Sequence, residues 1–224
     1  MTLVTATTNT RQLADIRDEL DANGATRIEG LWSSHFADRL AEEGLREWED
    51  ATRSFTTGYR AFPDGSVGGP LLQYWSGAGP ILDRLHRDPR VVALVEDLTG
   101  TPMQPVRASY LYYRRGGYCG LHRDRAEFEF QLLLAVAGAV GPLTVYPRLI
   151  AMPADELVTL LQTGAAPEGQ RIAFPRLGAI ALKSSAVPHA RPVHTGDQLM
   201  VVAGLNYRRL HQSGYDNSAR SRRA

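Results

Sequence analysis

The segment Tyr113-Arg-Arg-Gly-Gly-Tyr-Cys-Gly-Leu-His122-Arg-Asp124 carries the pattern that decides the fold and the chemistry of this chain. Its end places a histidine and an aspartate at positions i and i+2, which point to the same face of a β-strand. A third ligand from a neighbouring strand, His189, would complete a face of two histidines and one carboxylate. Such a face leaves coordination positions open and is typical of mononuclear non-haem Fe(II) sites.

The third ligand is chosen between two nearby histidines, His189 and His194. His189 is preferred because it lies at a strand end, just before the turn Pro-Val-His-Thr-Gly, whereas His194 lies inside that turn. The competing structural explanation is that His122 and Asp124 form a surface ion pair and that His189 is an ordinary turn residue.

The overall charge and length restrict the class of protein. The chain has 224 residues, 25 basic and 24 acidic, with a formal net charge of +1. Without a net positive field, nucleic acid is not expected as a partner. The length suits one domain. We expect helical support and an irregular loop over residues 1–104, a β-core over 105–210 and a tail over 211–224.

Cysteine content and hydropathy indicate the compartment. The single cysteine, Cys119, excludes an internal disulfide framework and fits a reducing cytoplasm. The first ten residues lack the pattern of a signal peptide. The chain also lacks an apolar run of the roughly 18 residues that a membrane span needs. We therefore expect a cytoplasmic protein without a membrane partner. The sequence does not indicate an oligomeric state.

The first half of the chain favours helices. Apolar spacing and capping residues predict helices over 10–22, 33–51, 80–86 and 89–98, with a short strand over 26–31. The glycine-rich segment 52–79 is expected to be irregular, and a loop of that length is usually functional or mobile.

The second half favours strands. These are predicted over 106–113, 128–136, 143–146, 172–174, 179–183 and 198–205, separated by glycine and proline turns. A short helix is predicted over 153–162, within an insert spanning 148–169. The pattern indicates a mainly β protein with N-terminal helices around one β-core.

The ordered motifs resemble those of the Fe(II)- and 2-oxoglutarate-dependent oxygenases, the prolyl-hydroxylase-like branch in particular. That branch shows Tyr-x-x-Gly, five further residues and then His-x-Asp, as Tyr113, Gly116, His122 and Asp124 do here. A distal histidine followed by Pro-Val-x-x-Gly is matched from His189 onward. The resemblance covers roughly residues 106–207. It implies a double-stranded β-helix, the jelly-roll or cupin-like core.

The sequence departs from the family in two places. The spacing between His189 and the following proline is one residue shorter than usual. The family also places Arg or Lys nine to eleven residues after the distal histidine, to bind the distal carboxylate of 2-oxoglutarate, but no cation occupies that window here. Because a buried carboxylate needs a partner, we expect a replacement. The candidates, in order, are Arg107, then Arg191 and Lys183, with Gln198 as a neutral donor.

The resemblance implies a dioxygenase that uses Fe(II), O2 and 2-oxoglutarate and oxidises, most simply hydroxylates, an unactivated C–H bond of a small molecule. It assigns iron to His122, Asp124 and His189, and gives Tyr113 a hydrogen bond to the cosubstrate. The arginine-rich composition and compact size favour a bacterial natural-product pathway. Two alternatives are open: an oxidase with the same ligands that does not use 2-oxoglutarate, and a non-catalytic jelly-roll binding module.

Overall fold

The computed structural model describes residues 10–210, and five α-helices and thirteen strands occur within that part of the chain. The helices are α1 (Thr10–Asn23), α2 (Ser34–Arg46), α3 (Pro80–His86), α4 (Pro89–Thr99) and α5 (Ala154–Gln162), with short 3-10 turns η1 (Glu47–Asp50) and η2 (Pro147–Leu149). The strands are β1 (Ala25–Ile28), β2 (Thr52–Thr56), β3 (Arg60–Ala61), β4 (Val67–Gly68), β5 (Leu71–Gly77), β6 (Met103–Tyr113), β7 (Tyr118–His122), β8 (Phe130–Ala137), β9 (Leu143–Val145), β10 (Gln170–Ile172), β11 (Ala179–Leu182), β12 (His189–Arg191) and β13 (Met200–Arg209).

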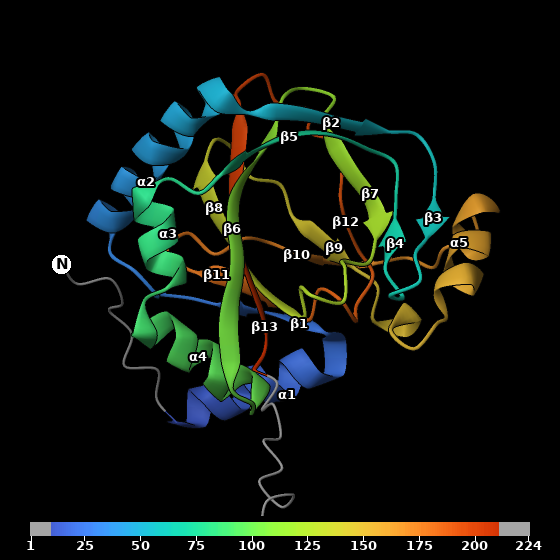
Figure 1. Cartoon of the computed structure of the whole chain (residues 1–224), viewed down its shortest axis with the longest axis horizontal. Helices are drawn as coiled ribbons and strands as arrows, with labels where there is room; N and C mark the ends of the chain where they lie inside the picture. Colours follow the sequence, from blue (N-terminus) through green and yellow to red (C-terminus); the bar gives the residue numbers. More distant parts are fainter. Residues whose placement is uncertain (1–9, 211–224) are drawn as a thin grey trace, which may run out of the picture.

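Eleven of these strands form one antiparallel sheet that folds back on itself. Its order is β1-β11-β8-β13-β6-β5-β7-β12-β9-β10, with β2 added to β5. Strand β5 joins the two halves, because residues 74–77 pair with β6 while Leu71 and Leu72 pair with β7. The result is the double-stranded β-helix that the sequence predicted. Helices α2, α3 and α4 lie along one outer side, and α5 lies at the opposite side beside β3 and β4 (Figure 1).

Strand β6 separates the main core from an internal cavity by the two-residue period of a strand. Its even-numbered side chains pack into the core beneath the helices; they are Ala108, Tyr110 and Tyr112. Its odd-numbered side chains line the cavity; they are Arg107, Ser109, Leu111 and Tyr113. The same alternation occurs on β8, where Leu132 and Leu134 face the core while Gln131 and Leu133 face the cavity.

The buried carboxylate of Glu43 connects the helical layer to the sheet. Only 1% of this residue is exposed. Its oxygens accept hydrogen bonds from the backbone N–H groups of Ile81 (2.6 Å) and Leu82 (2.9 Å), in the first turn of α3. The hydroxyl of Tyr110 on β6 donates to it at 2.7 Å. These bonds satisfy two of the N–H groups that a helix start leaves unpaired, and the helix dipole favours the negative charge. Glu43 therefore fixes α3 against α2 and β6.

Most predicted elements are confirmed, including all five helices, but the irregular segment predicted over 52–79 is wrong. That segment contains strands β2 to β5. Its side chains are mostly exposed or half-buried, so it shows no clean apolar alternation. Pairing with β6 and β7, rather than intrinsic preference, makes β5 a strand, and β2 pairs with β5 in turn. The ranges of β7 and β12, which are only five and three residues long, were not predicted, although the ligand argument placed His122 and His189 on strands.

Some predictions concern residues that the structure does not describe. The proposed tail and the segment tested for a signal peptide lie outside the described residues, except for Thr10. The prediction of one domain with parts over residues 1–104, 105–210 and 211–224 stays a prediction. Among the described helices, none combines the length and hydropathy that crossing a bilayer requires.

Glu43→Gln should lower the free energy of unfolding by about 1–3 kcal/mol, because the amide can accept only one of the two α3 N–H bonds and sets an N–H group against the other. Urea denaturation followed by circular dichroism measures this. The neighbouring exposed Glu42 provides the control, since Glu42→Gln should leave the midpoint nearly unchanged. Equal midpoints for the two variants would contradict the assigned role of Glu43.

Candidate metal centre

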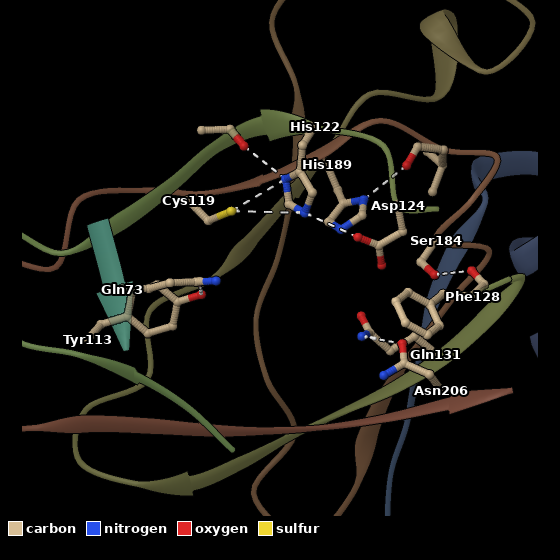
Figure 2. Close-up of polar contacts among 12 residues, drawn as sticks. Gln73, Tyr113, Cys119, His122, Asp124, Phe128, Gln131, Ser184, His189 and Asn206 are labelled. Carbon is tan, nitrogen blue, oxygen red and sulfur yellow. Dashed lines mark hydrogen bonds and ion pairs between the residues drawn. The ribbon is translucent and has the colours of Figure 1, made fainter. Parts of the chain in front are cut away.

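The centre is built on the pairing of two short strands. Strand β12 runs antiparallel to β7, and His189 lies directly opposite His122. Their rings lie 4.2 Å apart between centroids. With Asp124 they form a group in which one potential ligand atom from each residue lies within 4.8 Å of the others. Figure 2 shows the two imidazoles and the carboxylate converging from different segments.

Asp124 reaches this group from a loop, not from the strand on which it was predicted. His122 is the last residue of β7, and Arg123 forms a single bridge with Val67. Asp124 follows in irregular backbone, where its N–H donates to the carbonyl of Ser184 at 3.0 Å. The carboxylate Oδ1 still lies 3.5 Å from His122 Nε2. The Asp124 side chain still points toward His122, as the i, i+2 spacing predicts, although the strand has ended.

Backbone carbonyls orient both imidazoles. His122 Nδ1 lies 2.9 Å from the carbonyl oxygen of Gly120, and His189 Nδ1 lies 3.0 Å from that of Val187. Because a carbonyl only accepts, Nδ1 must be the protonated nitrogen in each ring. Nε2 of each ring is then the nitrogen available to bind a metal once it carries no proton, which is the usual arrangement of histidine ligands.

Protonation within the group is strongly coupled. For His189, burial and the neighbouring charge of His122 lower the pKa to about 4. Burial opposes charge on His122 too, but Cys119 and the Asp124 carboxylate outweigh it and raise its pKa well above the ordinary value. For Asp124, burial acts upward, yet the hydrogen bond from His122 and the charges of both rings lower the pKa. In the metal-free protein one proton therefore stays on His122, beside an ionised Asp124.

Arg123 points away from the ligands and anchors the surrounding loops. Only 8% of it is exposed. Its Nε donates to the carbonyl of Gly65 (3.0 Å), and its Nη1 donates to that of Met152 (3.0 Å). The β3–β4 hairpin and the segment around η2 are thereby attached to the backbone between His122 and Asp124.

The ligands line a cavity of about 140 Å³ whose wall includes a buried arginine. Arg191, two residues after His189, is 5% exposed. Its Nη1 donates to the carbonyl of Gly141 (3.1 Å), and its guanidinium carbon lies 5.6 Å from the ring centroid of Tyr113 and 4.9 Å from that of Phe174. Among the residues described, no carboxylate lies within 4.0 Å of it. Burial lowers its pKa, as expected for a charge without an anion.

Only some of the residues predicted to bind the cosubstrate line this cavity. Tyr113 and Arg191 lie together on the inner wall, and Arg107 lies at the exposed edge of the same cavity, over the ring of Phe128. Lys183 does not line the cavity and pairs with Asp21 at 2.5 Å. Gln198 is exposed and outside the cavity wall.

His194, the alternative ligand, is also directed elsewhere. Its Nε2 lies 2.8 Å from the carbonyl oxygen of Gln198, and it belongs to a separate pocket behind Arg191. The group of potential ligands contains His189 instead.

Three amide side chains of the cavity were not singled out from the sequence: Gln73, Gln131 and Asn206. Gln73 Oε1 accepts from the hydroxyl of Tyr113 at 2.8 Å, and Gln131 Nε2 donates to Asn206 Oδ1 at 2.8 Å (Figure 2). Gln131 and Asn206 are each a polar residue inside an otherwise apolar run, Phe130–Ala137 and 200–207. An amide inside such a strand is a signal that could have identified an internal polar cavity.

Comparison with known proteins supports the fold. No family model and no curated protein matches the sequence. Among solved structures, the chain is similar to the non-haem α-ketoglutarate-dependent epimerase SnoN from nogalamycin biosynthesis, with a TM-score of 0.69, 15% identity, and coverage of 89% of this chain and 81% of that one. It is also similar to HygX from Streptomyces hygroscopicus with nickel, 2-oxoglutarate and hygromycin B bound (TM-score 0.61, 15% identity, 91% and 88% covered).

A third neighbour is a 2OG-Fe(II) oxygenase family oxidoreductase from Burkholderia pseudomallei (TM-score 0.62, 17% identity, 90% and 93% covered). The double-stranded β-helix of this chain is thus the fold of Fe(II)- and 2-oxoglutarate-dependent oxygenases, and the chain carries a His-Asp-His group that could hold a metal.

Replacing His189 should remove metal binding, whereas replacing His194 should not. We expect His189→Ala to weaken Fe(II) binding by more than about a hundredfold, since it removes a direct ligand, a larger loss than outer partners cause. Anaerobic titration with calorimetric detection measures this. His194→Ala is the matched control, and the reverse ranking of the two variants would exclude His189 as the third ligand.

Metal affinity should rise with pH, because the metal must displace the proton held on His122. Between pH 6 and 8, the Kd for Co(II), an oxidation-resistant substitute, should fall by up to about tenfold per pH unit below the pKa of that imidazole. Calorimetry in two buffers of different ionisation enthalpy should show release of about one proton. A Kd independent of pH over this range would contradict the charged His122.

Proposed function

We propose that this protein is an Fe(II)- and 2-oxoglutarate-dependent dioxygenase that oxidises a C–H bond of a small molecule. The observation that carries the proposal is one cavity with two features: ligand atoms of His122, Asp124 and His189 gathered within 4.8 Å, and the buried Arg191 with no acidic partner among the described residues. The ligands fit Fe(II), since two neutral imidazoles and one carboxylate form the facial set of non-haem iron enzymes. The arginine fits the second carboxylate of 2-oxoglutarate.

Arg191 takes the role that the family gives to a cation further along the chain. Its planar guanidinium suits bidentate pairing with a carboxylate, and Tyr113 lies beside it. On β12, Arg191 and His189 are two residues apart and share a face. One short strand would therefore present a metal ligand and the cosubstrate anchor to the same space. Arg107, the first choice from the sequence, is left at the mouth of the cavity.

When bound, iron and 2-oxoglutarate supply the oxidising chemistry with O2, and the chain supplies orientation and exclusion of water. His122 and His189 are held by backbone carbonyls, so their Nε2 atoms do not need to reorient when a metal binds. Leu111, Leu133 and Phe128 form apolar parts of the wall, which limit access of bulk water to the reacting end of the substrate.

A small-molecule substrate in bacterial natural-product metabolism is the setting we propose. SnoN was solved in complex with Fe³⁺, α-ketoglutarate and nogalamycin RO, and HygX with hygromycin B. Hydroxylation is the simplest outcome, while the epimerase and carbocyclase descriptions of two neighbours show that similar folds serve other outcomes. Asp124 keeps the carboxylate that related halogenases lack, so halogenation is not proposed. The buried Arg191 in the cavity offers a replacement for the missing cation, which supports the use of 2-oxoglutarate over the oxidase alternative.

Anaerobic Fe(II) should produce a weak visible charge-transfer band only when 2-oxoglutarate is also added. Arg191→Gln should raise the 2-oxoglutarate concentration needed for half of the band by about ten- to a hundredfold, the loss of one charge-assisted pair. Lys183→Gln, which removes another candidate cation outside the cavity, is the matched control.

Iron binding without a band in the unaltered protein would sink the 2-oxoglutarate proposal and favour the oxidase. Absence of iron binding would leave the binding module. If Arg107→Gln weakens the band and Arg191→Gln does not, the residue that pairs with the distal carboxylate of 2-oxoglutarate is Arg107 and not Arg191.

A further inference from the structure

The cavity that holds the candidate metal ligands opens into a groove on the surface. The groove has a volume of about 450 Å³. Six residues line both spaces: Gln73, Arg107, Ser109, Leu111, Asp124 and Phe128. A molecule that enters the groove therefore meets the same side chains that lead to the open face of the ligand group.

The groove carries positive charge. Its charged residues are Arg107, Arg125 and Asp124, and Asp124 is the proposed iron ligand, whose charge the metal would neutralise. Arg125 lies 3.9 Å from Glu127, an exposed pair that contributes little. Arg107 has no carboxylate within 4.0 Å among the described residues. With iron bound, the groove has no free carboxylate to balance Arg107.

Arg107 is held in place rather than extended freely into solvent. Its guanidinium carbon lies 4.6 Å from the ring centroid of Phe128, a cation–π contact. Its backbone carbonyl accepts from Asn206 Nδ2 at 3.0 Å, and Asn206 is in turn paired with Gln131. A positioned arginine loses less entropy when it pairs with an anion, so it is better suited to recognition than a mobile one.

An aromatic side chain completes the groove. Trp75 lies on β5, on the same face as Gln73 and Leu71, and all three line the groove. It is 40% exposed, which is unusual for so large an apolar ring. Trp75 and Phe128 thus offer apolar surface, and Gln73 and Ser109 offer neutral polar groups between them.

We propose that the primary substrate is an organic anion with a flat apolar body. Its carboxylate or phosphate group pairs with Arg107, its body lies along Trp75 and Phe128, and the end to be oxidised reaches the face of His122, Asp124 and His189. The two arginines of the cavity thereby bind different anions. The buried Arg191 pairs with the cosubstrate, and the exposed Arg107 pairs with the substrate. This inference rests on the proposed function, because it takes the ligand group as the reacting end.

Binding of four probes that share one ring system tests the charge preference. The probes are 2-naphthylacetate, 2-naphthyl phosphate, neutral 2-naphthylacetamide and cationic 2-naphthylmethylamine. Calorimetry is performed anaerobically with Fe(II) and 2-oxoglutarate present. We expect at least one of the two anions to bind about ten- to a hundredfold more tightly than the amide, and the amine to bind most weakly. Which anion binds better distinguishes a carboxylate from a phosphate substrate.

Arg107→Gln should remove the preference for the anion over the amide. It should leave the charge-transfer band and its 2-oxoglutarate dependence unchanged. Arg84→Gln, which removes an exposed charge on α3, is the control and should keep the preference. If neither anion exceeds the amide, or if the preference survives in Arg107→Gln, the inference is overturned.

The band reports the proposed function separately from this inference. A band without anion preference leaves the oxygenase proposal intact and removes the substrate class. An Arg107-dependent preference without any band would show an anion site in a protein that does not chelate 2-oxoglutarate.

Discussion

The antiparallel pairing of β12 with β7 sets the geometry on which the site depends. Strand β12 has only three residues, yet it places His189 opposite His122 and, two residues on, directs Arg191 into the same cavity. A shift of one residue in this register would turn both side chains out of the cavity, because the side-chain period of a strand is two. The strand is held on its other edge by β9, where His189 and Ala190 pair with Val145 and Thr144. Neighbours on both sides therefore enforce a register that three residues alone would not fix.

Two buried charged side chains, Glu43 and Arg191, differ in how their charge is compensated. Glu43 receives three hydrogen bonds from α3 and Tyr110, which compensate for its loss of water. Arg191 interacts with one backbone carbonyl, the Tyr113 hydroxyl and the faces of two aromatic rings, none of which carries the negative charge that would balance it. The first arrangement belongs to a structural residue whose partners are all internal. The second is that of a group whose partner comes from outside, since an incoming carboxylate would recover part of the cost of burying it.

The family resemblance carried by the ordered motif was sufficient to predict the fold, and the same motif predicted the three candidate ligands that the structure brings together. The helices were predicted from apolar periodicity and capping residues, and the ligands from the ordered motif around His122 and His189. What the sequence did not contain was the set of contacts between distant segments. Strand β5 owes its conformation to pairing with β6 and β7, and β2 in turn pairs with β5. Arg191 is covered by Tyr113 and Phe174 whereas Arg107 is exposed, a difference that no local pattern in the sequence predicts.

Arg123 couples parts of the chain that would otherwise look like separate modules. It lies between two candidate ligands, and its side chain holds both the β3–β4 hairpin and the segment after η2. Loops around such a site are natural choices for exchange between homologues when a new specificity is sought. In this protein, a transplanted hairpin that does not offer a carbonyl where Gly65 offers one would release the guanidinium and loosen the backbone that carries Asp124. In a recombined protein, the β3–β4 hairpin, the η2 segment and residues 122–124 therefore have to come from the same parent sequence.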